Sequence, residues 1–131
     1  MGANKHILVV EDNAAARGAL AALLEAAGYA VACAANGREA LDHLRGPHRP
    51  CLILLDLSMP VMDGWEFRDR QRRSPSLACI PVILVSAEGD LPRLASSLGV
   101  AGYFPKPVEA DGLLRAIRVL GGGQAPALAA G

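Results

Sequence analysis

The sequence predicts an α/β protein built on a five-stranded parallel sheet with helices on both faces, a doubly wound (βα)5 arrangement. Short apolar runs alternate five times with longer stretches of helical periodicity. Three of the runs are continuously apolar, which is typical of strands buried on both faces of a parallel sheet. The expected strands are His6–Val10, Tyr29–Ala34, Cys51–Leu55, Ile80–Val85 and Ala101–Phe104.

Capping and breaking residues delimit the helices that we expect between these strands. Their approximate spans are 14–27, 37–44, 64–73, 89–98 and 109–120. Asn13, Asn36 and Asp63 are suitable N-caps for the first three, because their side chains accept hydrogen bonds from unpaired backbone N–H groups. Gly28 suits the end of the first helix, and Pro92 is tolerated only in the first turn of the fourth.

Length and composition are those of one globular domain. The chain has 131 residues, 52% of them hydrophobic, and its 13 basic and 13 acidic residues give zero net charge. This composition excludes a disordered polypeptide and gives no sign of a nucleic-acid partner. Strictly apolar runs such as Ala19–Leu24 are far below the roughly 20 residues that a membrane-spanning helix needs. We expect the domain to cover residues 1–121, with a flexible tail or linker stub over 122–131.

The three cysteines are Cys33, Cys51 and Cys79. Their spacing matches neither a metal site nor a redox motif, and each lies in or beside an apolar stretch. We therefore expect small buried side chains in a reducing compartment.

Carboxylate, hydroxyl and ammonium side chains follow the ends of several expected strands. Glu11 and Asp12 follow the first strand, Asp56 the third, Ser86 the fourth and Lys106 the fifth. Ligands of open α/β sheets bind beyond the carboxyl ends of the strands, so these groups are expected to converge. Crowded carboxylates repel one another unless a cation binds, and hard oxygen ligands suit Mg²⁺. A carboxylate at position 56 is a competent nucleophile toward phosphorus, with the ammonium and the hydroxyl available to phosphoryl oxygens.

Four sequence elements resemble the receiver domain of bacterial two-component response regulators, and the resemblance runs from His6 to about Leu120. They are Glu11-Asp12, the stretch Leu-Leu-Asp-Leu-Ser-Met-Pro-Val-Met-Asp-Gly at 54–64, Ser86-Ala87, and Tyr-Phe-Pro-Lys-Pro at 103–107. The pattern Asp-x-x-Met-Pro-x-Met-Asp-Gly is highly specific by itself. The resemblance implies a flavodoxin-like fold with strand order 2-1-3-4-5.

The resemblance also implies a role for each site residue. Asp56 would be the phosphoacceptor. Mg²⁺, with Mn²⁺ as a substitute, would be held by carboxylate oxygens of Asp12 and Asp56, by Glu11 through water, and by the backbone carbonyl of Ser58. Lys106 would contact carboxylates in the resting state and the phosphoryl group afterwards.

The implied switch consists of Ser86 and Tyr103. In the family, the hydroxyl moves toward the phosphoryl group and the aromatic ring fills the vacated space. Glu88, two residues beyond the hydroxyl, is expected to affect access to the phosphoryl group. The Lys106–Pro107 bond is typically cis. The output surface would comprise the fourth helix, the fifth strand and the fifth helix, with candidate residues Arg93, Ser96, Ser97, Arg115 and Arg118.

The implied partners are a sensor histidine kinase or histidine phosphotransfer protein upstream, and a downstream protein target or fused output domain. We expect a cytoplasmic protein with no direct nucleic-acid contact and no membrane insertion, and a signalling domain rather than a classical enzyme. The sequence does not decide between a stand-alone regulator and the receiver of a larger protein.

Other classes of α/β protein fit the sequence less well. A phosphatase of the haloacid dehalogenase type needs a second Asp two residues after its nucleophile, where Ser58 stands. In a flavodoxin the first loop must cradle a phosphate, which Glu11 and Asp12 would repel, and no P-loop motif is present. The alternative that stays open is a pseudo-receiver, a protein-binding module that is not phosphorylated. Such modules typically lose the acceptor, the acidic pair or the lysine, and this chain keeps all three.

Overall fold

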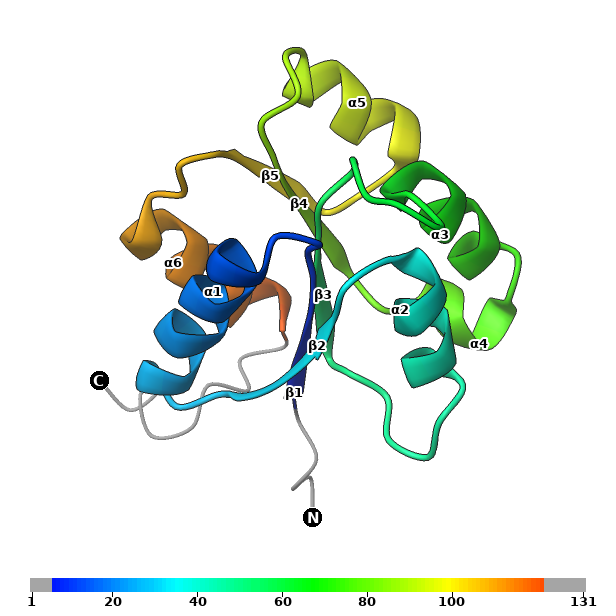
Figure 1. Cartoon of the computed structure of the whole chain (residues 1–131), viewed down its shortest axis with the longest axis horizontal. Helices are drawn as coiled ribbons and strands as arrows, with labels where there is room; N and C mark the ends of the chain where they lie inside the picture. The colour runs from blue at the N-terminus through cyan, green and yellow to red at the C-terminus, as the bar shows by residue number, and fades with distance from the viewer. Residues whose placement is uncertain (1–5, 122–131) are drawn as a thin grey trace.

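The computed structural model describes residues 6–121, which fold around a parallel sheet. Its strands are β1 (His6–Val10), β2 (Ala30–Ala34), β3 (Leu52–Leu55), β4 (Val82–Ser86) and β5 (Gly102–Pro105). They pair in the order β2-β1-β3-β4-β5, and every pair is parallel (Figure 1). The predicted fold class and strand order are therefore confirmed.

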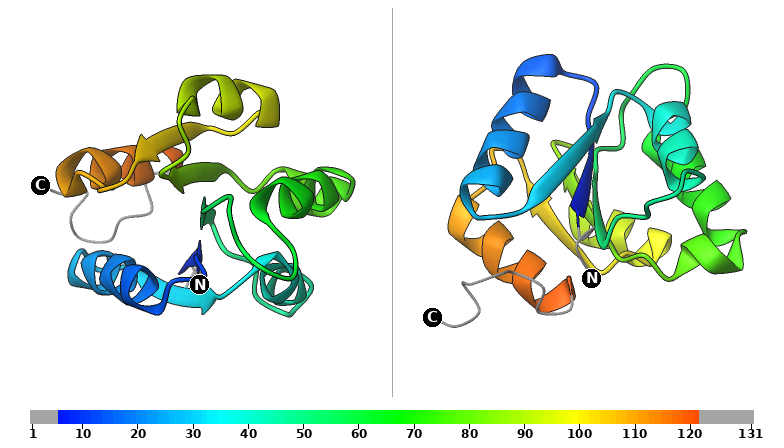
Figure 2. Two further views of the ribbon diagram at one scale, coloured as in Figure 1. Left: turned by 45° about the horizontal axis from the view of Figure 1, so that its top comes forward. Right: turned by 90° about the horizontal axis from the view of Figure 1, so that it is seen from below.

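The helices lie in two layers, one on each face of the sheet. They are α1 (Ala14–Ala26), α2 (Gly37–Leu44), α3 (Gly64–Arg72), α4 (Pro75–Ala78), α5 (Leu91–Leu98) and α6 (Ala110–Leu120). Figure 2 shows α1 and α6 together on one side of the sheet and α2 and α3 on the other. No helix within residues 6–121 has the length and apolar character needed to cross a membrane.

Alternating side chains of the central strands form two cores. Leu8 and Val10 pack with Phe67 in the core beneath α2, α3, α4 and α5. Ile7 and Val9 pack with α1 and α6 in the other core. Successive residues of a strand face opposite sides of a sheet, so continuously apolar strands fill both cores. This explains why the three apolar runs predicted the three central strands.

The predicted N-caps are confirmed at all three positions. Side-chain oxygens of Asn13, Asn36 and Asp63 accept hydrogen bonds from the backbone N–H three residues on, at 2.8, 2.9 and 2.9 Å. Pro92 lies in the first turn of α5, where its missing N–H costs nothing. The Lys106–Pro107 bond is cis, as the resemblance implied.

The structure differs from the sequence analysis in one short helix and in the burial of the cysteines. Helix α4 was not predicted, because four residues are too few to show helical periodicity. The cysteines were expected to be buried, but Cys33 and Cys79 are exposed and Cys51 is half-buried. Cys33 lies on the edge strand β2, and Cys79 follows the short helix α4 at the surface. The expected tail at 122–131 lies outside the described residues.

Buried polar side chains join α3 to α5. The Arg68 guanidinium donates to the carbonyl oxygens of Leu98 and Gly99, at 2.9 and 2.7 Å, and to the Gln71 side chain at 2.8 Å. The Gln71 amide group donates in turn to the carbonyl oxygens of Leu77 and Ile80. Burial, with the nearby charge of another arginine, lowers the pKa of Arg68. The guanidinium therefore compensates the negative C-terminal end of α5 in place of a carboxylate partner.

Candidate functional site

The site lies at the carboxyl edge of the sheet, where backbone hydrogen bonds continue just past the strands. The N–H of Glu11 donates to Ala34 O at 3.0 Å, that of Asp56 to Val10 O at 3.0 Å, and that of Lys106 to Ser86 O at 3.1 Å. These bonds fix the first residue after β1, after β3 and after β5. The three functional side chains are thus held by the rigid sheet rather than by mobile loops.

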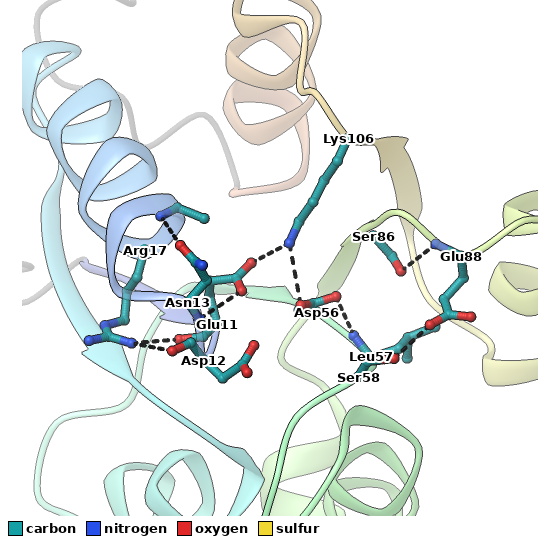
Figure 3. A network of polar contacts seen from close by, with 11 residues as sticks. Glu11, Asp12, Asn13, Arg17, Asp56, Leu57, Ser58, Ser86, Glu88 and Lys106 are labelled. Atoms are coloured by element: carbon teal, nitrogen blue, oxygen red, sulfur yellow. Dashed lines mark hydrogen bonds and ion pairs between the residues drawn. The ribbon is translucent and has the colours of Figure 1, made fainter.

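Three carboxylates and one ammonium group meet at this edge (Figure 3). Oxygens of Glu11, Asp12 and Asp56 lie within 4.8 Å of one another. Lys106 Nζ donates to Glu11 Oε1 at 2.5 Å and to Asp56 Oδ2 at 3.3 Å. Glu11 and Asp56 are buried, with exposed fractions of 2% and 8%, whereas Asp12 is exposed. The sequence prediction that these residues converge agrees with this geometry.

The pKa values of the two buried carboxyl groups, Asp56 and Glu11, shift in opposite directions. Burial raises the pKa of Asp56, the charge of Glu11 raises it further, and Lys106 only partly offsets both. Burial acts in the same sense on Glu11, but hydrogen bonds from Lys106 and from the Asn13 N–H outweigh it and lower the pKa of that carboxyl. Burial opposes the charge of Lys106, yet its two carboxylate partners raise the pKa of the ammonium group. The lysine therefore mainly compensates Glu11 and leaves Asp56 the less stable anion.

Oxygen donors of this kind fit a hard divalent cation. The cluster offers carboxylate oxygens from Glu11, Asp12 and Asp56 with only one nearby ammonium group. Mg²⁺ takes such oxygens and keeps several waters, and the exposed carboxylate of Asp12 leaves room for water ligands. The donor set is therefore suited to Mg²⁺.

The loop that follows Asp56 is fixed by close packing. Asp56 Oδ1 accepts the Leu57 N–H at 2.8 Å, and Leu57 O accepts the Gly64 N–H at 2.9 Å. A Cβ atom at Gly64 would lie 2.8 Å from Leu57 Cα, a distance that real structures do not show. A glycine is required there so that the start of α3 can contact the loop that follows Asp56.

Two hydrogen bonds connect the loops on either side of the pocket (Figure 3). The Ser58 hydroxyl donates to Glu88 Oε2 at 2.6 Å, and the Glu88 N–H donates to Ser86 Oγ at 3.1 Å. Ser86 is buried, whereas Ser58 is exposed. Sequence reasoning placed Glu88 near the pocket but missed its contact with Ser58, which joins residues 30 positions apart.

Arg17 makes a second contact with the site that sequence reasoning missed. Its Nη1 donates to the carbonyl oxygens of Glu11 and Asp12, at 2.8 and 3.3 Å. An arginine one turn into α1 thus orients the acidic loop. The sequence gives no indication of this contact, because an arginine on a helix normally extends into solvent.

Of the expected switch residues, Ser86 lies at the pocket, whereas Tyr103 and the expected output residues lie outside the acidic cluster. Tyr103 in β5 is opposite Leu84, and its side chain is 43% exposed, so the ring is not enclosed in the core. The sequence elements called the fourth and fifth helices are α5 and α6. The candidate output residues are all exposed: Arg93, Ser96, Ser97, Arg115 and Arg118.

Fold and site together define the class of protein: a doubly wound α/β domain with an acidic, lysine-containing pocket at the carboxyl edge of its sheet. The model of the response regulator receiver domain family matches residues 7–118, and the chain belongs to that family. It is thus a receiver domain of the two-component signalling type.

Curated relatives agree with this assignment. The chain is 36% identical over 117 residues to the polar-differentiation response regulator DivK of Brucella anthropi, covering 87% of this chain and 94% of DivK. It is 39% identical over 116 residues to the response regulator MprA of Mycolicibacterium vanbaalenii, covering 87% of this chain but 49% of MprA. The similarity therefore extends to relatives of about this length and to one twice as long.

Solved structures show the same fold. A signal receiver domain of a histidine kinase from Syntrophus aciditrophicus has a TM-score of 0.81 and 33% identity, with 93% of each chain covered. The chemotaxis protein CheY4 of Vibrio cholerae has a TM-score of 0.79 and 30% identity, covering 88% of this chain and 98% of CheY4.

Proposed function

We propose that this receiver domain accepts a phosphoryl group on Asp56 from the phosphohistidine of a sensor histidine kinase or a histidine phosphotransfer protein. One observation carries the proposal: the buried carboxylate of Asp56 adjoins Lys106 and an acidic pair at a rigid sheet edge. A carboxylate oxygen attacks phosphorus, an acyl phosphate forms, and the histidine nitrogen leaves with the bonding electrons. Such a transfer depends mainly on positioning and charge compensation.

In this proposal, different residues of the pocket hold the metal ion and contact the phosphoryl group. Carboxylate oxygens of Asp12 and Asp56 and the Ser58 carbonyl would hold Mg²⁺ or Mn²⁺, with Glu11 acting through a water ligand. The bound metal ion supplies positive charge to the phosphoryl oxygens during the transfer. Lys106 already contacts Asp56 Oδ2 at 3.3 Å, so its ammonium group is within reach of a phosphoryl oxygen on that atom.

Phosphorylation replaces the single negative charge of the Asp56 carboxylate by an acyl phosphate with about two negative charges and three strong acceptor oxygens. In the proposed switch the Ser86 hydroxyl, which now accepts from the Glu88 N–H, turns to donate to a phosphoryl oxygen. Tyr103 then moves inward, and the surface of α5, β5 and α6 changes for a downstream protein target or a fused output domain. This is a signalling role rather than classical enzyme action, and we assign it to the cytoplasm, where we expect the phosphoryl donor.

A pseudo-receiver is the less favoured function. It needs none of the charge arrangement seen here, in which Glu11, Asp56 and Lys106 are buried or partly buried together. Burying charges costs stability unless they are used or paired, and three carboxylates against one ammonium group leave the pocket incompletely paired.

The test is intact-mass measurement after incubation with Mg²⁺ and acetyl phosphate as the phosphoryl donor. We expect one added phosphoryl group on the unaltered chain and none on Asp56→Asn. Asp42→Asn, on the exposed side of α2, is the matched control and should be modified like the parent. Absence of the adduct with acetyl phosphate and with phosphohistidine donors would support the pseudo-receiver instead.

A further inference from the structure

The loop before α3 and the first turn of α3 expose two large apolar side chains. Val61 is 79% exposed and Trp65 is 38% exposed, and they are two of the four large hydrophobic residues exposed within residues 6–121. Tryptophan is strongly enriched among residues that dominate binding energy at protein interfaces. Trp65 belongs to α3 and Val61 to the loop before it, and α3 lies beside α2 on one side of the sheet (Figure 1).

The backbone at Val61 is strained. Its φ is 69°, and the Met62 N–H donates to Pro60 O at 2.7 Å, which closes a three-residue turn around the valine. A β-branched residue with positive φ is an outlier, and glycine or asparagine relieves this strain. Because the side chain is largely exposed, packing within the domain does not explain why a valine stands there.

Grooves flank α3 on both sides. One, of about 390 Å³, lies between α2 and α3 and is lined by Arg38, Arg45, Val61 and Arg70 among others. The other, of about 310 Å³, lies between α3 and α5, with Trp65, Arg72 and Arg73 in its lining. Each exposed apolar side chain therefore adjoins a groove that contains arginines.

The charge of this surface is positive. Apart from the buried Arg68, five exposed arginines line the two grooves. The grooves also contain three carboxylates, those of Asp42, Glu66 and Asp69. Glu66 and Asp69 are already paired with arginines, at 2.9 and 3.0 Å. Arg38 and Arg45 form no ion pair with any residue in the range 6–121, so their guanidinium groups are available to carboxylates from outside.

We propose that this α3 surface, with Val61, Arg38, Arg45 and Arg70 on the α2 side of the helix and Trp65 on the α5 side, binds an acidic segment of a partner protein that also carries apolar side chains and lies across α3. Aromatic residues and arginine are the residue types enriched at protein interfaces. Guanidinium groups bind carboxylates with two parallel hydrogen bonds, and Val61 and Trp65 supply the apolar contacts. The surface adjoins the proposed α5, β5 and α6 output surface, since Ser97 of α5 lines the groove beside Trp65. Binding there does not require phosphorylation.

Selection of displayed random 12-residue peptides that lack tryptophan tests the proposal on the whole unphosphorylated chain. Selected peptides should combine Asp or Glu with aromatic or aliphatic residues. Trp65 is the only tryptophan, so binding of a selected peptide should shift its fluorescence. The Arg38→Gln/Arg45→Gln variant should weaken binding at least 10-fold, and Val61→Asn should weaken it too.

A variant with the same change in net charge serves as the control. Ala22→Glu/Ala26→Glu alters exposed positions of α1 on the other face of the sheet and should bind the peptides within twofold of the parent. Peptides without acidic residues, or equal weakening in both charge variants, would overturn the proposal. Self-association that Val61→Asn abolishes would also overturn it, because the occupant would then be a second copy of the chain. None of these outcomes bears on phosphorylation of Asp56.

Discussion

Val61→Asn is expected to stabilise the domain, although it replaces an apolar residue by a polar one. A residue held in a sparsely populated backbone region costs about 1–3 kcal/mol, and asparagine adopts positive φ far more readily than valine. Since Val61 is 79% exposed, the substitution loses only about a fifth of the roughly 2 kcal/mol gained by burying a valine side chain. The net gain is about 1 kcal/mol, or about 3–5 °C in Tm for a domain of this size.

Chemical and thermal unfolding monitored by circular dichroism measure this gain. Val119→Asn is the matched control, because Val119 is 75% exposed on α6 and valine and asparagine have similar helix propensities. Its unfolding free energy should change by less than about 0.5 kcal/mol. If Val61→Asn is no more stable than Val119→Asn, the backbone at Val61 carries no strain, and the reasoning from its φ angle is refuted.

Three further predictions concern the pocket and the histidines. Mg²⁺ should raise the Tm of the parent at constant ionic strength, and Asp12→Asn should abolish this rise. The control Asp42→Asn should keep it. An unchanged rise in Asp12→Asn would show that Asp12 is not a ligand of the metal. Glu88→Gln should raise the rate of phosphorylation by anionic acetyl phosphate about 2- to 10-fold, measured by intact mass, because a carboxylate leaves the pocket entrance; an equal or slower rate would contradict this. Burial and the charge of His6 lower the pKa of His43 below 6.5. As the pH decreases, this histidine therefore takes up a proton in the unfolded chain before it does so in the folded chain. The free energy of unfolding should consequently fall between pH 7 and pH 5.5. In urea unfolding His43→Gln should reduce that slope, and an unaltered slope would show that His43 does not cause it.

Most of the fold could be predicted because its central strands and helix starts have strong local signals. Continuous apolar runs indicated β1, β3 and β4, and single residues such as Asn13 and Asp63 indicated where helices begin. The edge strand β2 is different, since only part of it is buried. Cys33 lies in this apolar run and was therefore expected to be buried. The strand is at the edge of the sheet, and Cys33 is exposed.

The candidate site was predicted as a set of strand ends, but not as a set of contacts. Topology brings Glu11, Asp56 and Lys106 together whatever the loops do, so their convergence followed from the strand pattern. The hydrogen bond between Ser58 and Glu88 depends on the paths of two loops, which no periodicity encodes. Arg68 is a similar case, because a polar residue in a helix rich in arginine gives no sign that it is buried.

The buried contacts of Arg68 determine how α5 can move. They hold the carbonyl groups of Leu98 and Gly99 at the C-terminal end of the helix, while its N-terminal end follows the loop that carries Glu88. The N-terminal end is held by apolar packing of Leu91, which is 3% exposed, and apolar packing is non-directional. Any tilt of α5 is therefore smallest at Leu98 and largest at Leu91, the end that is linked through the loop to Ser86.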